Sequence, residues 1–406
     1  MESNERRQRF RLELNFPSES QRKDTRRKLL SQDGSSLATH LKIHSDSDQQ
    51  PVAVRSNDDA NLIVTDIHPR ITGVGSTIRT LAPHIHSLEP MMMVSPRTVS
   101  GIPRTGIIGA IAACLKKPVD RPFRIWHARR NKEMLLGLLI KHLFRGRIRL
   151  VMTSCALRRH SWFPRQLLGS MDAIIATSDE AASYVRNVVA TIPHGVDCDR
   201  FQPAEDRLAA FRQLNFPGQR GISIAGRIRP EKGTDLFVDA MIALLPQFPD
   251  FTACIAGRAT VEHEAFLRHL KSRIEKAGLT DRFVWAGEVP YDQMAGFHSA
   301  MSLCVAPARY EGFGLVPLEA MACGVPVVAS RTGCYSDVIV PQVTGELVPC
   351  DDLPALIQAL NSLMANPDRL DQMGQVGRIQ VEQNYSAKLE AARINEVYRQ
   401  LWENAA

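Results

Sequence analysis

Two glutamates, Glu311 and Glu319, stand eight positions apart in the stretch RYEGFGLVPLEAMACGVPVVAS, residues 309–330. Between them Gly312 and Gly314 have no Cβ, so the backbone can approach a ligand closely. Pro317 is typical of the first turn of a helix. A phosphate would fit here because free amides and the positive end of a helix dipole both attract anions. The expected donors are the amides of Gly314, Leu315 and Val316.

The two acids themselves need an explanation, because carboxylates beside an anion are costly unless they accept hydrogen bonds from hydroxyl groups. A nucleotide sugar carries hydroxyls at both ends of its diphosphate. The spacing therefore fits one acid on the sugar and one on the ribose, with the phosphates on the amides between them. A solvated Glu311 before a turn, with Glu319 supporting the start of a helix, is the alternative.

A second stretch, AGRIRPEKGTDLF at residues 225–237, also follows an apolar run and leads into a helical pattern. It places Arg227 and Lys232 where a diphosphate would need cationic partners. Taken alone, the stretch is equally typical of a solvated basic turn. Together with the glycine-containing turn it favours a phosphate site.

The elements that would position these residues alternate between short apolar strands and segments of helix length, which predicts parallel sheets with crossover helices. The pattern begins at 61–67, breaks at the proline and glycine residues of 190–203, and starts again after residue 221. Both halves therefore read as doubly wound α/β domains, in which ligands bind beyond the carboxyl ends of the strands. The predicted divisions are 1–60, 61–195, 196–385 and 386–406, the last a single helix.

The length of 406 residues agrees with two globular domains. Residues 1–60 are polar and lack a sustained period, so we expect a disordered extension, with a helical arm or a wrongly assigned start as alternatives. No apolar stretch reaches the roughly 20 residues that cross a bilayer, and the N-terminus has no secretory signal. The eight cysteines are scattered without a C-x-x-C pair, and the sequence predicts a cytoplasmic protein.

Positive charge is concentrated in residues 101–170, where fifteen lysines and arginines face two acids, a net charge of +13 in a chain of net charge +7. Such a segment attracts lipid phosphates, a phosphorylated glycolipid or nucleic acid. Few aromatic residues and no reader motif disfavour nucleic acid. Within the segment, 131–150 has leucines at helical spacing, which suits a helix at an anionic membrane surface or one packed in a core.

The pairing of GRIRPEKG with EGFGLVPLEAMACGVPVVAS resembles the GT-B glycosyltransferases of family 4, whose E-x7-E signature is Glu311 to Glu319 here. The resemblance covers most of 61–400. It implies two Rossmann-like domains facing an interdomain cleft, with an acceptor in the first and a nucleotide sugar in the second. The last helix, around 387–403, has the length to pack across to the first domain. Arg227 and Lys232 would hold the diphosphate, Glu319 the ribose and Glu311 the transferred sugar. It also implies transfer with retention of anomeric configuration and without a metal or other cofactor.

In the first domain, ITGVGST corresponds to the family's glycine loop, with Gly73 and Gly75 near the donor phosphate, although the usual adjacent glycines are here separated by Val74. His127, in IWHARR, matches the histidine that reaches the reacting sugar, whereas a lone histidine at a strand end is more often structural.

The combination of IWHARRNKEM and TGVGSTIRTL is similar to bacterial lipopolysaccharide-core mannosyltransferases. This implies transfer of mannose from GDP-mannose to the Kdo of an inner-core Kdo-lipid A acceptor, by a protein bound peripherally at the cytoplasmic face of the inner membrane. The alternatives are a family 4 enzyme that uses a UDP-sugar or a soluble acceptor, and a noncatalytic nucleotide-binding regulatory protein.

Overall fold

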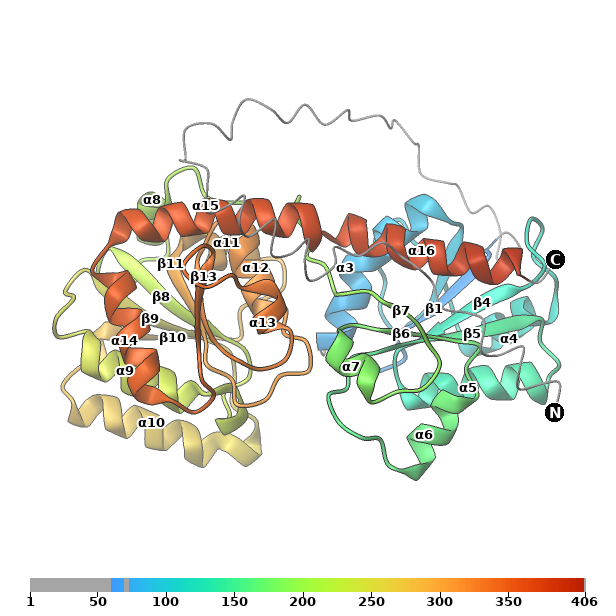
Figure 1. Cartoon of the computed structure of the whole chain (residues 1–406), viewed down its shortest axis with the longest axis horizontal. Helices are drawn as coiled ribbons and strands as arrows, with labels where there is room; N and C mark the ends of the chain where they lie inside the picture. Colours follow the sequence, from blue (N-terminus) through green and yellow to red (C-terminus); the bar gives the residue numbers. More distant parts are fainter. Residues whose placement is uncertain (1–59, 69–72, 405–406) are drawn as a thin grey trace. The chain divides into compact units, whose positions relative to one another are not determined.

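The computed structural model describes residues 60–68 and 73–404, so residues 1–59 of the predicted extension lie outside the described part (Figure 1). The chain divides into two compact units. The first contains the residues up to Gly195 together with those from Ala387 onward, and the second runs from Val196 to Ser386. The last helix therefore belongs to the first unit.

The first unit is built on a seven-stranded parallel sheet in the order β3-β2-β1-β4-β5-β6-β7. The strands are β1 (Leu62–Thr65), β2 (Met91–Val94), β3 (Arg104–Thr105), β4 (Arg124–Ala128), β5 (Ile148–Ser154), β6 (Ala173–Ala176) and β7 (Val188–Thr191). Successive side chains of a strand point to opposite faces of the sheet, and here both faces are buried under helices. The apolar residues of the strands therefore divide between two clusters, one on each face.

Helices cover both faces of the first sheet (Figure 1). One apolar cluster joins it to α3 (Gly73–Leu88) and α16 (Ala387–Glu403), and the Trp402 indole of α16 donates a 2.9 Å hydrogen bond to the Phe123 carbonyl. A second cluster joins the other face to α4 (Ile107–Leu115), α5 (Asn131–His142) and α6 (Trp162–Gly169). The short α7 (Asp179–Ser183) connects β6 to β7.

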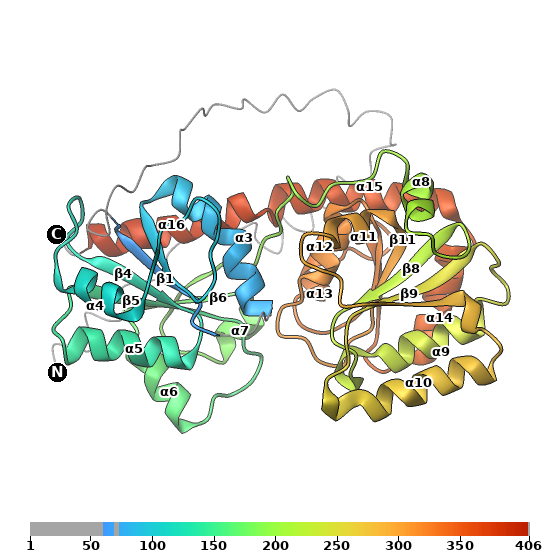
Figure 2. The same cartoon turned by 180° about the vertical axis from the view of Figure 1, so that it is seen from behind.

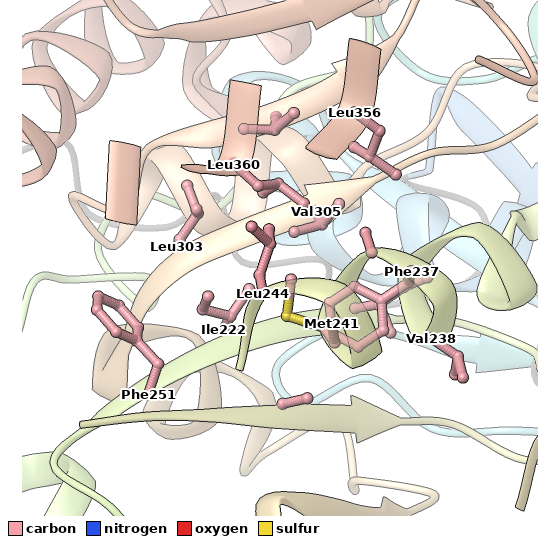
Figure 3. Packing of buried hydrophobic residues seen from close by; sticks show 14 of the residues in the cluster. Ile222, Phe237, Val238, Met241, Leu244, Phe251, Leu303, Val305, Leu356 and Leu360 are labelled. Carbon is pink, nitrogen blue, oxygen red and sulfur yellow. The ribbon is translucent and has the colours of Figure 1, made fainter. Parts of the chain in front are cut away.

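The second unit has a six-stranded parallel sheet in the order β10-β9-β8-β11-β12-β13. Its strands are β8 (Arg220–Ala225), β9 (Phe251–Ala256), β10 (Phe283–Gly287), β11 (Met301–Ala306), β12 (Val327–Ser330) and β13 (Gly345–Val348). The helices α9 (Thr234–Leu244), α10 (Glu264–Lys276) and α14 (Leu353–Met364) share one apolar cluster with the sheet (Figure 2). Figure 3 shows Met241 and Leu244 of α9 packed beside Ile222 and Leu303 of the strands.

The opposite face of this sheet carries α8 (Arg207–Gln213), α11 (Met294–Ala300), α12 (Val316–Ala322) and α13 (Tyr335–Val338), and α15 (Pro367–Asn384) contacts both faces' clusters at the end of the unit. Both units are thus doubly wound, Rossmann-like α/β domains, and this part of the prediction is confirmed. The helix that follows the 225–237 stretch starts at Thr234, because Gly233 adopts a left-handed φ of 68° after the short 3-10 turn Pro230–Lys232.

Candidate functional site

The two predicted motifs follow β8 and β11, which are neighbours in the second sheet. Parallel strands present their carboxyl ends at one edge, so the loops after β8 and β11 meet there. A Cβ on Gly233 would lie 2.0 Å from the Pro307 carbonyl oxygen, so only glycine allows the first loop to pass this close to the second. This close approach places Lys232 beside the start of the EGFG turn.

Lys232 and Glu311 form an ion pair between Nζ and Oε2 across this contact. Their side chains are 22% and 16% exposed, so the pair is partly shielded from water. The Glu311 carboxylate also accepts hydrogen bonds from the Gly312 amide at 3.1 Å and the Tyr335 hydroxyl at 3.4 Å. Burial and the nearby Glu311 charge raise the pKa of Tyr335 well above its usual value, so this hydroxyl stays protonated and remains a donor. Three donors thus fix the position of one carboxylate.

Arg309 ties the two loops together from the side. Its guanidinium donates to both carboxylate oxygens of Asp235, at 2.8 Å each, and to the Pro230 carbonyl at 2.6 Å. Its backbone amide donates to the Glu231 carbonyl at 2.9 Å. The hydrogen bonds to Asp235 raise the pKa of Arg309, so the charge of this clamp is permanent. Arg309 therefore holds the loop of Lys232 against the loop of Glu311.

The EGFG turn requires glycine at Gly314, whose φ is 87°. A Cβ there would lie 2.5 Å from the Tyr335 ring and 2.7 Å from Cγ of Glu311. Helix α12 begins directly afterwards, with Pro317 in its first turn as predicted. In the described part of the chain, no hydrogen bond is donated by the amides expected to hold a phosphate, Gly314, Leu315 and Val316.

Glu319 lies in the first turn of α12, and its carboxylate is 3.6 Å from Nε2 of His298 on α11. His298 is fully buried, and neither of its ring nitrogens has a hydrogen-bond partner in the structure. The pairing keeps Glu319, which is 13% exposed, near the mouth of the loop without contact to Glu311. Arg227 is exposed and forms no ion pair with another residue that the structure describes.

In the first unit, His127 lies at the carboxyl end of β4 and is 1% exposed. Its Nδ1 is 2.5 Å from the Tyr398 hydroxyl, and its Nε2 is 2.8 Å from Oγ1 of Thr153. Burial, together with the charge of Arg129, lowers the pKa of His127 well below its usual value, so the imidazole is neutral near pH 7. With both ring nitrogens occupied, the predicted contact of His127 with a sugar would require one of these partners to move.

Gly73 and Gly75 form the first turn of α3. Gly73 has open space around it, whereas a Cβ on Gly75 would lie 3.2 Å from Oδ2 of Asp66, at the end of β1. Oδ2 of Asp66 is buried and has no hydrogen-bond partner in the described part of the chain, and its Oδ1 pairs with Arg130 at 2.9 Å. The glycine loop thus adjoins an acidic group that the sequence did not single out.

The structure brings Lys232, Glu311 and Gly314 into one cluster, with Glu319 on the adjoining helix, whereas His127, Gly73 and Gly75 belong to the other unit. Sequence reasoning missed Arg309 and Asp235. A signal for them did exist, because Arg309 stands two residues before Glu311 and Asp235 three after Lys232. Opposite charges beside two motifs that meet in the fold indicate an ion pair that holds the two loops together.

Among residues 60–68 and 73–404, no group of three or more His, Cys, Asp or Glu side chains could hold a metal ion. Nor does any helix of the same residues have the length and apolar character to cross a membrane. The cysteines of this part are free thiols, and all but Cys155, Cys198 and Cys350 are buried.

Comparison with known proteins gives this geometry its context. The sequence model of the family Glycosyl transferases group 1 matches residues 206–380. The lipopolysaccharide core biosynthesis mannosyltransferase LpsB of Rhizobium meliloti is 41% identical over 347 residues, covering 84% of this chain and 98% of LpsB. A GDP-mannose-dependent alpha-(1-6)-phosphatidylinositol monomannoside mannosyltransferase of Mycolicibacterium smegmatis is 31% identical over 51% of this chain and 55% of its own length.

Among solved structures, Anabaena HepE in complex with UDP-glucose superposes with a TM-score of 0.70. The alignment covers 84% of this chain and 99% of HepE at 18% identity, so it bears on the fold alone. The predicted resemblance to glycosyltransferases and the two-domain GT-B architecture are both confirmed.

Proposed function

The chain belongs to the family of group 1 glycosyltransferases, and we propose that it transfers mannose from GDP-mannose to an anionic acceptor of the lipopolysaccharide inner core, Kdo-lipid A. The prediction of an enzyme is confirmed by the family. Mannose as the sugar is supported by the names of the relatives, since LpsB is a lipopolysaccharide core mannosyltransferase and the Mycolicibacterium protein is GDP-mannose-dependent.

The observation that carries the proposal is the Lys232–Glu311 pair beside the unpartnered amides of Gly314, Leu315 and Val316. A carboxylate next to a diphosphate is tolerable here because Lys232 already compensates its charge. Departure of the nucleoside diphosphate builds negative charge on its terminal phosphate, and preorganised donors stabilise charge that develops in the transition state. Lys232, the amides and the exposed Arg227 supply those donors in our proposal.

The two acids then have separate tasks. Glu311, held by three donors, contacts hydroxyls of the transferred sugar. Glu319 accepts hydrogen bonds from the ribose, with His298 behind it. The roles of His127, Gly73 and Gly75 in the first unit stay predictions from the sequence. The new glycosidic bond forms on the face of the anomeric carbon that the phosphate leaves, and transfer requires no metal or other cofactor.

The acceptor proposal also includes a peripheral contact with an anionic membrane, at the cytoplasmic face of the inner membrane where the donor is available. Helices α4, α5 and α6 pack on the same side of the first sheet through a single apolar cluster (Figure 1). Met134 and Ile140 of α5 are buried, so part of 131–150 packs in the core. These helices and the residues that follow α5 nevertheless expose Ile107, Ile108, Leu115, Leu135, Leu139, Leu143, Phe144, Trp162 and Phe163.

Exposed cations accompany these side chains, among them Lys116, Lys117, Lys132, Arg145, Arg158, Arg159 and Arg165. Apolar side chains mixed with lysine and arginine favour the interface of an anionic bilayer. Replacing Trp162 and Phe163, 67% and 50% exposed, by serine should weaken binding to phosphatidylglycerol vesicles about tenfold or more. Val261→Ser, at an 86% exposed position of the second unit, is the matched control. Equal binding by both variants in a vesicle sedimentation assay would contradict the membrane contact.

Transfer to Kdo-lipid A tests the function directly. The purified protein is offered GDP-mannose, UDP-glucose, UDP-galactose and UDP-GlcNAc separately, with EDTA present, and the product is identified by mass spectrometry. We expect transfer from GDP-mannose alone. Transfer from a UDP-sugar would overturn the mannosyl assignment, and transfer that EDTA abolishes would overturn metal independence. Transfer only to a soluble sugar would overturn the acceptor.

A further inference from the structure

Arg129 is a buried cation for which the described structure provides no counter-charge. It follows β4 directly, at the carboxyl edge of the first sheet, and is 7% exposed. Its backbone amide donates to Oε2 of Glu133 at 2.8 Å. Its guanidinium, however, donates no hydrogen bond to another residue of 60–68 or 73–404, and its Nε is sealed from solvent without a partner.

Arg124, on the same strand, shows what a structural buried arginine looks like in this unit. It is 0% exposed, and its guanidinium donates to the carbonyl oxygens of Ala60 at 2.8 Å, of Lys116 at 2.5 Å, and of Ala113. Burial of a charged group costs several kcal/mol unless hydrogen bonds or an opposite charge compensate it. Arg124 meets this requirement from the protein's own backbone, whereas Arg129 does not.

Two acids at the same edge of the sheet, Glu133 and Asp66, are already engaged. Glu133 accepts hydrogen bonds from three backbone amides and from Oγ1 of Thr65, and it pairs with Arg130 at 3.2 Å. Asp66 pairs with Arg130 at 2.9 Å. Both carboxylates therefore pair with Arg130, the residue next to Arg129, and their hydrogen bonds keep them there.

The position of Arg129 is one where ligands are expected. In doubly wound sheets ligands bind beyond the carboxyl ends of the strands. Two further buried polar atoms at this edge have no hydrogen-bond partner among residues 60–68 and 73–404. They are Oγ1 of Thr177, directly after β6, and Oδ2 of Asp66, after β1. Buried polar groups in folded proteins are generally hydrogen-bonded, and a ligand bound at this edge would complete the hydrogen bonds of these atoms.

We propose that Arg129 binds an anionic group of the acceptor, a carboxylate or a phosphate, at the carboxyl edge of the first sheet. The planar guanidinium suits both oxyanions, because two parallel N–H groups match two oxygens. The assignment to the acceptor rests on the proposed function, in which the first unit binds the acceptor. The presence of an anion site does not.

The binding test compares Arg129→Gln with Arg186→Gln, which removes the same charge at an exposed position two residues before β7 in the same unit. Thermal unfolding of the full chain is followed with free Kdo, Kdo methyl ester, inorganic phosphate or GDP. We expect Kdo or phosphate to raise the Tm of the wild type and of Arg186→Gln by more than that of Arg129→Gln, since a ligand stabilises a protein only through the sites that bind it. If Kdo raises the Tm and its methyl ester does not, the group that Arg129 binds is a carboxylate. If inorganic phosphate raises the Tm and Kdo does not, the group is a phosphate.

Without ligand, Arg129→Gln should unfold at the wild-type temperature or above it, because an uncompensated buried charge is removed. Arg129→Met, which keeps the stem without the charge, should behave in the same way. If both variants have a lower Tm than the wild type, Arg129 is a structural residue like Arg124, and the proposal is wrong. The proposal also fails if both Arg129 variants keep the ligand-induced rise in Tm, or if only the rise caused by GDP is lost, since the anion would then be the donor's.

Kinetics separate this inference from the proposed function. With Kdo-lipid A as acceptor, Arg129→Gln should lower kcat/KM on the order of 10- to 100-fold through the acceptor KM, the effect of losing one charge-assisted contact, with the donor KM unchanged. An unchanged acceptor KM in an active enzyme would refute the role of Arg129 and leave the function intact. The wild type could instead transfer no mannose while Kdo still raises its Tm by more than that of Arg129→Gln. That result would refute the function and leave the anion site intact.

Discussion

Replacing Arg309 by lysine keeps the positive charge of the clamp between the two loops but removes its planar fork. Nη1 of Arg309 donates both to the Pro230 carbonyl and to one oxygen of Asp235, and a lysine ammonium can replace this one nitrogen. Lysine has no second nitrogen to replace Nη2, so the 2.8 Å bond to the other oxygen of Asp235 is lost. Both side chains of the Arg309–Asp235 pair are less than a third exposed, at 29% and 24%, so solvent screening is incomplete.

Losing charge-assisted hydrogen bonds of this kind costs about 1 to 2 kcal/mol of the free energy of unfolding. The bond to Asp351, which is 62% exposed, adds little because water screens it. For a unit of this size the stability loss corresponds to a fall in Tm of about 2 to 8 °C. The effect on activity should be larger in proportion, because a shift of about 1 Å in a catalytic group can cost about 100-fold in rate. We expect kcat to fall about 10- to 100-fold.

The matched control is Arg369→Lys. Arg369 pairs with Glu346 at 3.2 Å in the same unit, with side chains 34% and 21% exposed, and lies on α15 away from both loops. Thermal unfolding and steady-state transfer are measured for both variants at a temperature well below either Tm. Both should lose stability, but only Arg309→Lys should lose kcat. A wild-type kcat in Arg309→Lys, or an equal loss in Arg369→Lys, would refute the view that Arg309 positions the catalytic loop.

Three further predictions concern the same two sites. Gly314→Ala should lose about 1 to 3 kcal/mol of stability and most of its kcat, because alanine is strained at a φ of 87° and its Cβ meets two side chains. Gly296→Ala, at a position with open space around it, should leave both the Tm and kcat unchanged. Lys232→Met should lower kcat by about 100-fold or more and destabilise the protein by leaving Glu311 unpaired, whereas adding Glu311→Gln should restore Tm but not activity. The stability contributed by His127 should be present above pH 6.5 and fade as the pH falls, since the unfolded chain takes up a proton that the buried, low-pKa imidazole does not. In urea unfolding between pH 5 and 8, His127→Gln should make the free energy of unfolding depend less on pH.

The alternation of strands and helices in both units followed from the sequence because most of the buried strands are short apolar runs between turn residues. Strands that depend on their neighbours for definition were less visible. β13 (Gly345–Val348) carries Glu346 and is only half-buried, and it is a strand because it pairs with β12. The boundary at Gly233 depended on a close approach to Pro307, which no local pattern encodes.

For the site, the sequence identified both halves of the Lys232–Glu311 cluster but not their pairing, which joins residues 79 positions apart. Loops that follow neighbouring parallel strands must meet, so their proximity could be predicted from topology. The surroundings of His127 could not, because its partner Tyr398 is 271 positions away on α16. Arg129 was visible only as one charge among fifteen in the basic segment. Its burial without a partner is a property of the fold.

The two units handle the charges of their sites in opposite ways. In the second, Lys232 and Glu311 neutralise one another, so the loop can keep its shape whether or not a diphosphate is present. In the first, the Arg129 guanidinium has no hydrogen-bond partner among the described residues, and its burial is a standing cost in the free protein. An anionic ligand removes that cost on binding, so the gain in affinity comes partly from relief of a penalty rather than from new contacts alone. A neutral analogue would fill the same space without this relief, and for that reason the unpaired arginine favours acidic over neutral acceptors.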